Sequence, residues 1–192
     1  MKKTFLLLLL FPIAGFAQHL KFMGIPIDGA PNSFGKQLQA KEFTQQQQLN
    51  GFKTDTNYLN MFFKGKFTGK DVLIDVISST ITNNVCRVCV IFDEREKDSS
   101  DVEEHFKKLK EHYSIKYEFD TIKYKTTEKE HYFTRPHREH DILKIKKWVY
   151  FKAEYGTIYL ITDYSSIIAV YSDSSNVEED KKLRDSKKLE DI

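Results

Sequence analysis

Alternating apolar and polar residues, rich in β-branched and aromatic side chains, recur in two groups along the chain. Such alternation is typical of half-buried β-strands. The first group consists of residues 59–67, 71–77 and 85–92. The second group consists of residues 148–155, 158–164 and 167–171. Turn residues such as Thr68 and Gly69 separate neighbouring strands, so each group is predicted to form an antiparallel β-meander.

Helical periodicity precedes each group of strands. Phe34 and Leu38 lie about one turn apart and predict a first helix with one apolar side. A second helix is predicted at residues 101–114, where Ser100 and Glu103 have the spacing of a capping box. The apolar side of this second helix consists of Val102, Phe106, Leu109 and Tyr113.

These elements predict an α+β fold, in which antiparallel meanders pack against helices in two layers. Because both groups follow a helix, one interpretation is a tandem α-β-β-β repeat with halves at 18–98 and 99–173. The other interpretation is that two unrelated meanders resemble each other. The polar tract at 45–48 is predicted to be a loop or a frayed helix end. Residues 121–141 are predicted to be a long loop with room for one strand.

The N-terminus has the order of a secretory signal peptide. Lys2 and Lys3 precede an uncharged run at 5–13, and small residues at Gly15 and Ala17 follow. The apolar run is shorter than the roughly 20 residues that a membrane span needs. We therefore predict that residues 1–17 are removed and that the mature chain is exported to the periplasm or outside the cell, without a transmembrane segment. An uncleaved N-terminal anchor or a buried helix is the alternative.

Composition bounds the mature chain further. The whole chain has 30 basic and 28 acidic residues, and the two lysines of the signal account for the difference, so the mature chain is formally neutral. Neutrality disfavours nucleic-acid binding, which concentrates positive charge on one domain. Residues 18–173 have the length of a single domain. Residues 174–192 are dominated by Ser, Asp, Glu and Lys, and are predicted to form a charged, solvated C-terminal tail with room for some helix.

Two cysteines, Cys86 and Cys89, stand three residues apart in a predicted strand. Residues at this spacing point to opposite faces and lie about 10 Å apart. A disulfide needs Cα atoms within about 7 Å. We therefore predict two separate thiols, with Cys86 in the core.

Several segments recur in the same order in a known family. They are His19 to Gly29, Phe63 to Gly69, Val88 to Phe92, Leu109 to Tyr113, Tyr155 to Ile158 and Leu189 to Ile192. In these segments the chain resembles a family of small exported proteins of unknown function from Bacteroidetes, over nearly the whole mature length. The resemblance implies export in a bacterial periplasmic or extracellular setting. It implies no chemistry, because the family has no established activity.

Candidate chemistry is sparse. His131, His137 and His140 are near acidic residues and are weak candidates for metal ligands, although Pro136 interrupts the segment and surface histidines are the simpler interpretation. The sequence has no G-x-S-x-G, G-x-G-x-x-G, Walker A or H-E-x-x-H motif. Catalytic residues are therefore unknown, and no cofactor is predicted.

Aromatic residues are concentrated in the second meander, which contains Trp148, Tyr150, Tyr155, Tyr159, Tyr164 and Tyr171. Alternation divides them between two faces, so one face could present aromatic rings to a protein or glycan partner. Coverage of these rings by a helix or by the C-terminal segment is the other interpretation. The sequence thus favours a non-catalytic binding or protein-interaction module. A small exported hydrolase whose site leaves no motif is the alternative.

Overall fold

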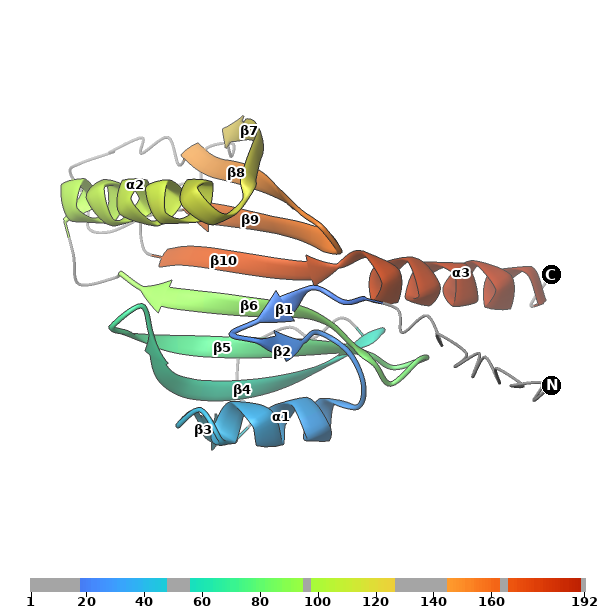
Figure 1. Ribbon diagram of the computed structural model, residues 1–192. Coiled ribbons are helices and arrows are strands. Elements are labelled where there is room, and N and C mark those ends of the chain that lie inside the picture. Colours follow the sequence, from blue (N-terminus) through green and yellow to red (C-terminus); the bar gives the residue numbers. More distant parts are fainter. Residues whose placement is uncertain (1–17, 48–55, 95–97, 127–144, 163–165, 191–192) are drawn as a thin grey trace, which may run out of the picture.

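Eight antiparallel strands form the main sheet of the computed structural model, which describes residues 18–47, 56–94, 98–126, 145–162 and 166–190. The strands are β3 (Thr44–Gln46), β4 (Tyr58–Phe67), β5 (Lys70–Ser79), β6 (Val85–Asp93), β7 (Glu118–Thr126), β8 (Ile145–Ala153), β9 (Gly156–Thr162) and β10 (Ser166–Asp173). Their order across the sheet is β3-β4-β5-β6-β10-β9-β8-β7 (Figure 1). The predicted α+β class is confirmed.

Both predicted meanders are present, as β4-β5-β6 and β8-β9-β10. Thr68 and Gly69 join β4 to β5 with φ angles of 51° and 79°, the left-handed values of a tight hairpin turn. The prediction for the polar tract is wrong at residues 45–46, which belong to β3. The Phe43 ring lies over Gly65, where any side chain would overlap it, and this contact holds the polar strand against β4.

The first helix, α1 (Pro31–Gln39), buries Phe34 and Leu38 as predicted. Gly35 lets the helix approach the sheet closely, because an added Cβ would lie 2.9 Å from Cζ of Phe63.

The second helix, α2 (Ser99–Lys116), is slightly longer than predicted. It buries Val102, His105, Phe106, Leu109 and Tyr113. The predicted capping box does not form, because the helix begins two residues earlier, after Asp98, and has no side-chain cap.

Both helices lie on the same face of the sheet (Figure 1). The ring of Tyr113 in α2 is 5.7 Å from that of Phe151 and 6.1 Å from that of Tyr171. Cross-strand register places both rings on the same face as Phe63, which α1 covers. Between the helices, the centre of the Phe22 ring lies 5.1 Å from the centre of the Tyr171 ring. Phe22 belongs to the small hairpin formed by β1 (Lys21–Phe22) and β2 (Ile25–Pro26).

The C-terminal segment forms α3 (Ser174–Glu190), which runs on from β10 beyond the end of the sheet (Figure 1). Polar contacts rather than an apolar stripe hold it. Asn176 is 4% exposed, and its side-chain amide donates to the carbonyls of Ile27 and Val85 at 2.9 and 3.0 Å. Asp180 is 2% exposed. The segment predicted to be a solvated tail is therefore helical over residues 174–190 and attached to the sheet.

The residues that follow the predicted cleavage point are also part of the fold. The backbone N–H of Leu20 donates to Oδ2 of Asp173 at 2.8 Å, and His19 Nδ1 lies 3.2 Å from Oδ1 of the same carboxylate. No helix among the described residues is long and apolar enough to cross a membrane.

Candidate functional site

The sheet face opposite α1 and α2 carries two rows of side chains, which we call the sheet-face surface. Alternation sends every second residue of each strand to this face, and register aligns these residues across five strands. The first row consists of Leu73, Ile91, Ile168, Ile161 and Trp148. The second row consists of Asp75, Cys89, Val170, Tyr159 and Tyr150. None of the described helices lies over these rows.

The first row is apolar along its whole width and charged at both ends. All five of its side chains are half-buried. Register continues the row to Lys64 on β4 and to Lys123 on β7, and both lysines are exposed. The surface is therefore an apolar strip bounded by two positive charges.

Three of the predicted aromatic residues lie together on this surface. The rings of Tyr150 and Tyr159 are 5.3 Å apart, and Lys123 Nζ is 5.0 Å from the centre of the Tyr150 ring. Trp148 is two residues before Tyr150 on the same strand, so it shares this face. These three rings share one face of the sheet and are half-buried there, so their presentation to a partner stays a prediction.

The other aromatic residues of the second meander lie elsewhere. Tyr171 is on the helix-covered face, where its hydroxyl lies 2.5 Å from that of Tyr113. Burial raises the pKa of both phenols well above the ordinary value. Tyr155 lies in the turn between β8 and β9, and Tyr164 is outside the described residues.

A buried carboxyl group, Asp75, interrupts the sheet-face surface. Its side chain is 6% exposed, and the amide of Asn60 donates to both carboxylate oxygens at 2.9 Å. Burial raises the pKa of Asp75 to about 6, although the Asn60 hydrogen bonds lower it in part. A buried carboxyl group of this kind lowers the stability of the folded protein when it is ionised. Carboxyl groups with shifted pKa values are concentrated at functional sites.

Both thiols are free, as predicted, and Cys86 is buried. Cys89 lies directly across from Asp75. Burial raises the pKa of Cys86 to about 11 and that of Cys89 to about 12. Because the thiolate is the reactive form, neither thiol is activated as a nucleophile.

The remaining candidates add no site. His131, His137 and His140 lie outside the described residues, and the described residues contain no cluster of metal-ligating side chains. A buried pair, His105 Nδ1 and Glu94 Oε1 at 2.7 Å, lies under α2 beside the Phe92 ring and joins helix to sheet.

Comparison with known proteins gives no match to a family model, a curated protein or a solved structure. Sequence reasoning identified the aromatic residues of the surface, but not its flanking lysines or the place of Asp75. Alternation alone could have assigned each residue to a face. The alignment of five strands into rows required the register.

Proposed function

We propose that this protein is an exported, non-catalytic module that binds a protein partner through the sheet-face surface. The observation that carries the proposal is the apolar row from Leu73 to Trp148, which no described helix covers. Large apolar patches on soluble proteins mark interaction sites. The lysines at both ends of the row add the polar rim that such interfaces have.

A protein fits this surface better than a glycan does. Four of the five residues of the first row are aliphatic, and aliphatic side chains give a glycan no partner for its hydroxyl groups. The Tyr150 and Tyr159 pair beside Trp148 is the observation that favours a glycan as the second candidate, since aromatic faces stack on sugars.

The alternative of a small exported hydrolase would place Asp75 at its centre, because a pKa of about 6 suits a general base. The amide of Asn60 is hydrogen-bonded to Asp75, and Cys89 is its cross-strand neighbour on β6. An amide is not a nucleophile, and a thiol with a pKa of about 12 is protonated at neutral pH. This chemistry supports binding rather than hydrolysis.

We also propose that the domain arose by duplication of a two-layer unit. The element order α1-β3-β4-β5-β6 recurs as α2-β7-β8-β9-β10, which adds one strand to each predicted repeat. Outward from the central β6–β10 pair, the strands follow as β6-β5-β4-β3 on one side and as β10-β9-β8-β7 on the other. The two halves therefore have the same strand order. The sheet-face surface spans this central pair, so both halves contribute to the binding site.

Ile161→Lys is expected to abolish partner binding. It places a charge in the middle of the apolar row, and a desolvated charge at the centre of an interface costs at least about tenfold in affinity. The measurement compares immobilised parent and variant, with quantitative mass spectrometry of the proteins that each retains from an envelope extract of the producing cells.

The matched control is Ile115→Lys on α2, where the side chain is 86% exposed and far from this surface. A partner should be retained by the parent and by this control, and lost by Ile161→Lys. Identical retention by all three proteins would contradict the proposal, provided that their melting temperatures agree. If the parent binds immobilised glycans and Ile161→Lys does not, a glycan would be the favoured ligand instead of a protein.

The exported protein is expected to lack residues 1–17. Cleavage after Ala17 removes none of the described residues, and it keeps the hydrogen bond between the Leu20 N–H and the Asp173 carboxylate. The intact mass of the protein recovered from the medium or periplasm tests the prediction. Recovery of a chain that still begins at Met1 would show that the N-terminal segment is an anchor.

A further inference from the structure

The chain is tied to the start of α3 from the second residue after the predicted cleavage point. His19 lies between two carboxylates, with Nδ1 3.2 Å from Oδ1 of Asp173 and Nε2 3.3 Å from Oδ2 of Asp28. The Leu20 N–H donates to Oδ2 of Asp173 at 2.8 Å, and the Asn176 N–H donates to Oδ1 at 3.0 Å. Asp173 is fully buried and directly precedes α3. We call these five residues the N-terminal clasp.

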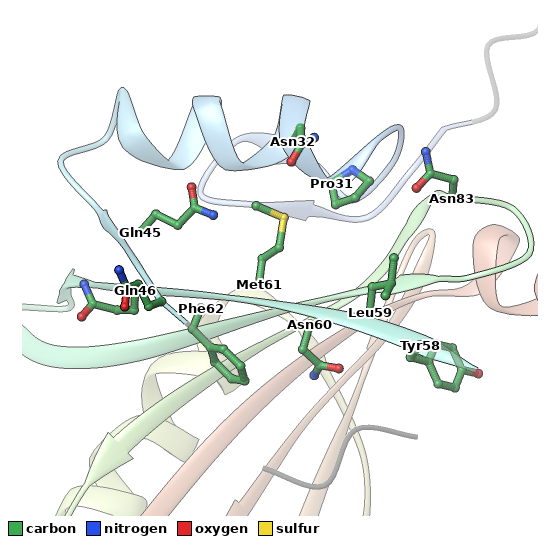
Figure 2. A pocket seen from close by; sticks show the side chains of 11 residues that line it. Pro31, Asn32, Gln45, Gln46, Tyr58, Leu59, Asn60, Met61, Phe62 and Asn83 are labelled. Atoms are coloured by element: carbon green, nitrogen blue, oxygen red, sulfur yellow. The ribbon is translucent and has the colours of Figure 1, made fainter. Parts of the chain in front are cut away.

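The clasp also holds the segment that leads into α1. The side-chain amide of Asn176 donates to the Ile27 carbonyl at 2.9 Å. A few residues later α1 begins at Pro31, which lines a cleft of about 750 Å³ together with Leu59 and Met61 of β4 (Figure 2). Loss of the clasp would therefore loosen the segment that places α1 on the sheet.

Gln18 directly precedes the clasp and is exposed. Cleavage after Ala17 gives this glutamine a free α-amino group. The ordinary pKa of such a group is about 7.7–8.0, so a fraction of it is uncharged and nucleophilic at neutral pH. The side-chain amide carbon of the same residue is within its reach, because the attack closes a five-membered ring. Intramolecular attack of this kind has a high effective concentration.

We propose that Gln18 of the exported protein is converted to pyroglutamate, and that this cap protects the N-terminal clasp from aminopeptidases. The α-amino nitrogen forms a bond to Cδ of its own side chain, and the bond between Cδ and Nε2 breaks. One proton moves from the attacking amine to the departing nitrogen, which leaves as ammonia, and no co-reactant is consumed. The resulting lactam has no terminal positive charge. The proposal rests on the cleavage after Ala17 that accompanies the proposed export.

The cap has a consequence for the fold because the clasp begins at the very next residue. Chain ends are preferred sites of proteolysis. An aminopeptidase recognises a free α-amino group and removes one residue at a time, so two steps would remove Gln18 and His19. The second step takes away the imidazole between Asp28 and Asp173 and leaves a buried carboxylate with fewer partners. Pyroglutamate offers no α-amino group, so the first step cannot begin.

The test uses protein exported from the full-length precursor, together with Gln18→Ala, which has no side-chain amide and cannot cyclise. Both are incubated at neutral pH, and mass spectrometry is applied to the intact chains and to their N-terminal peptides. The parent is expected to begin at residue 18 and to be lighter than its sequence by the mass of one ammonia. Gln18→Ala should begin at the same residue and have its full mass.

Both folded proteins are then treated with an aminopeptidase of broad specificity. Gln18→Ala should lose residues 18 and 19, and its melting temperature should fall by roughly several degrees, while the parent stays unchanged. Treatment of the parent with a pyroglutamyl peptidase, which removes the cap, should make it as sensitive to the aminopeptidase as the variant.

Three distinct results would overturn the proposal. A parent that begins at residue 18 with an unmodified glutamine would refute the cap and leave the proposed export intact. Equal trimming of the parent and Gln18→Ala would show that the cap does not protect the clasp. An exported chain that still begins at Met1 would contradict the cleavage itself, and this proposal with it.

Discussion

Phe106→Ala should lower the free energy of unfolding by about 3–5 kcal/mol. The ring is 1% exposed and lies between α2 and the sheet, where Lys147 Nζ is 5.2 Å from its centre. Truncation removes the transfer free energy of the ring and leaves a cavity, because the surrounding strands cannot close around the alanine. The total free energy of unfolding of a domain is only about 5–15 kcal/mol, so the variant would be marginally stable. Thermal unfolding should show a melting temperature lower by roughly ten degrees.

Ile115→Ala is the matched control, since it removes a large apolar side chain from the same helix at a position that is 86% exposed. It should change stability by no more than about 0.5 kcal/mol. Equal melting temperatures for Phe106→Ala and the parent would mean that α2 does not pack on the sheet through this side.

The sequence predicts the six strands of the two meanders because one side of each is fully buried and the pattern therefore alternates. It predicts α2 for the same reason, since Phe106 and Leu109 recur at helical spacing. Both predictions rest on contacts that apolar side chains make with a core. This is why the class of fold could be derived without the structure.

Two elements were not predictable in this way, because polar or glycine contacts hold them. The strand β3 is polar and stays on β4 through Phe43, whose ring occupies the space that Gly65 leaves empty. The helix α3 has no apolar stripe and is attached through Asn176 and Asp180. A hydrogen-bonding side chain gives no periodic signal, since its partner can be anywhere in the chain.

The candidate sites were predictable only in part, for a related reason. Composition identified Trp148 and its neighbouring tyrosines, whereas the row that they complete joins residues from β5 to β8. This alignment is not visible in a local pattern.

Asp75→Asn should raise the stability of the protein at neutral and alkaline pH by about 3 kcal/mol. Burial raises the pKa of Asp75 to about 6 from the ordinary value of 3.8, and one pKa unit corresponds to about 1.4 kcal/mol. The folded protein therefore holds a proton that the unfolded chain releases between these two values. Stability falls as pH rises through this window and stays low above it. The asparagine is neutral at every pH, so it removes this cost.

The measurement is urea unfolding of parent and variant below about pH 3 and at about pH 8. The two proteins should have similar stability at the low pH, where the Asp75 carboxyl is protonated in both states, and should diverge at the high pH. Asp71→Asn, an exposed position on the same strand, is the control and should change little at either pH. If the free energy of unfolding changed with pH in the same way for the parent and for Asp75→Asn, ionisation of Asp75 would not lower the stability of the fold. Asp75 lies at one end of the second row of the sheet-face surface and lowers the stability of the fold. Loss of stability is often the cost of a binding site, so the same variant should also be assayed for partner retention.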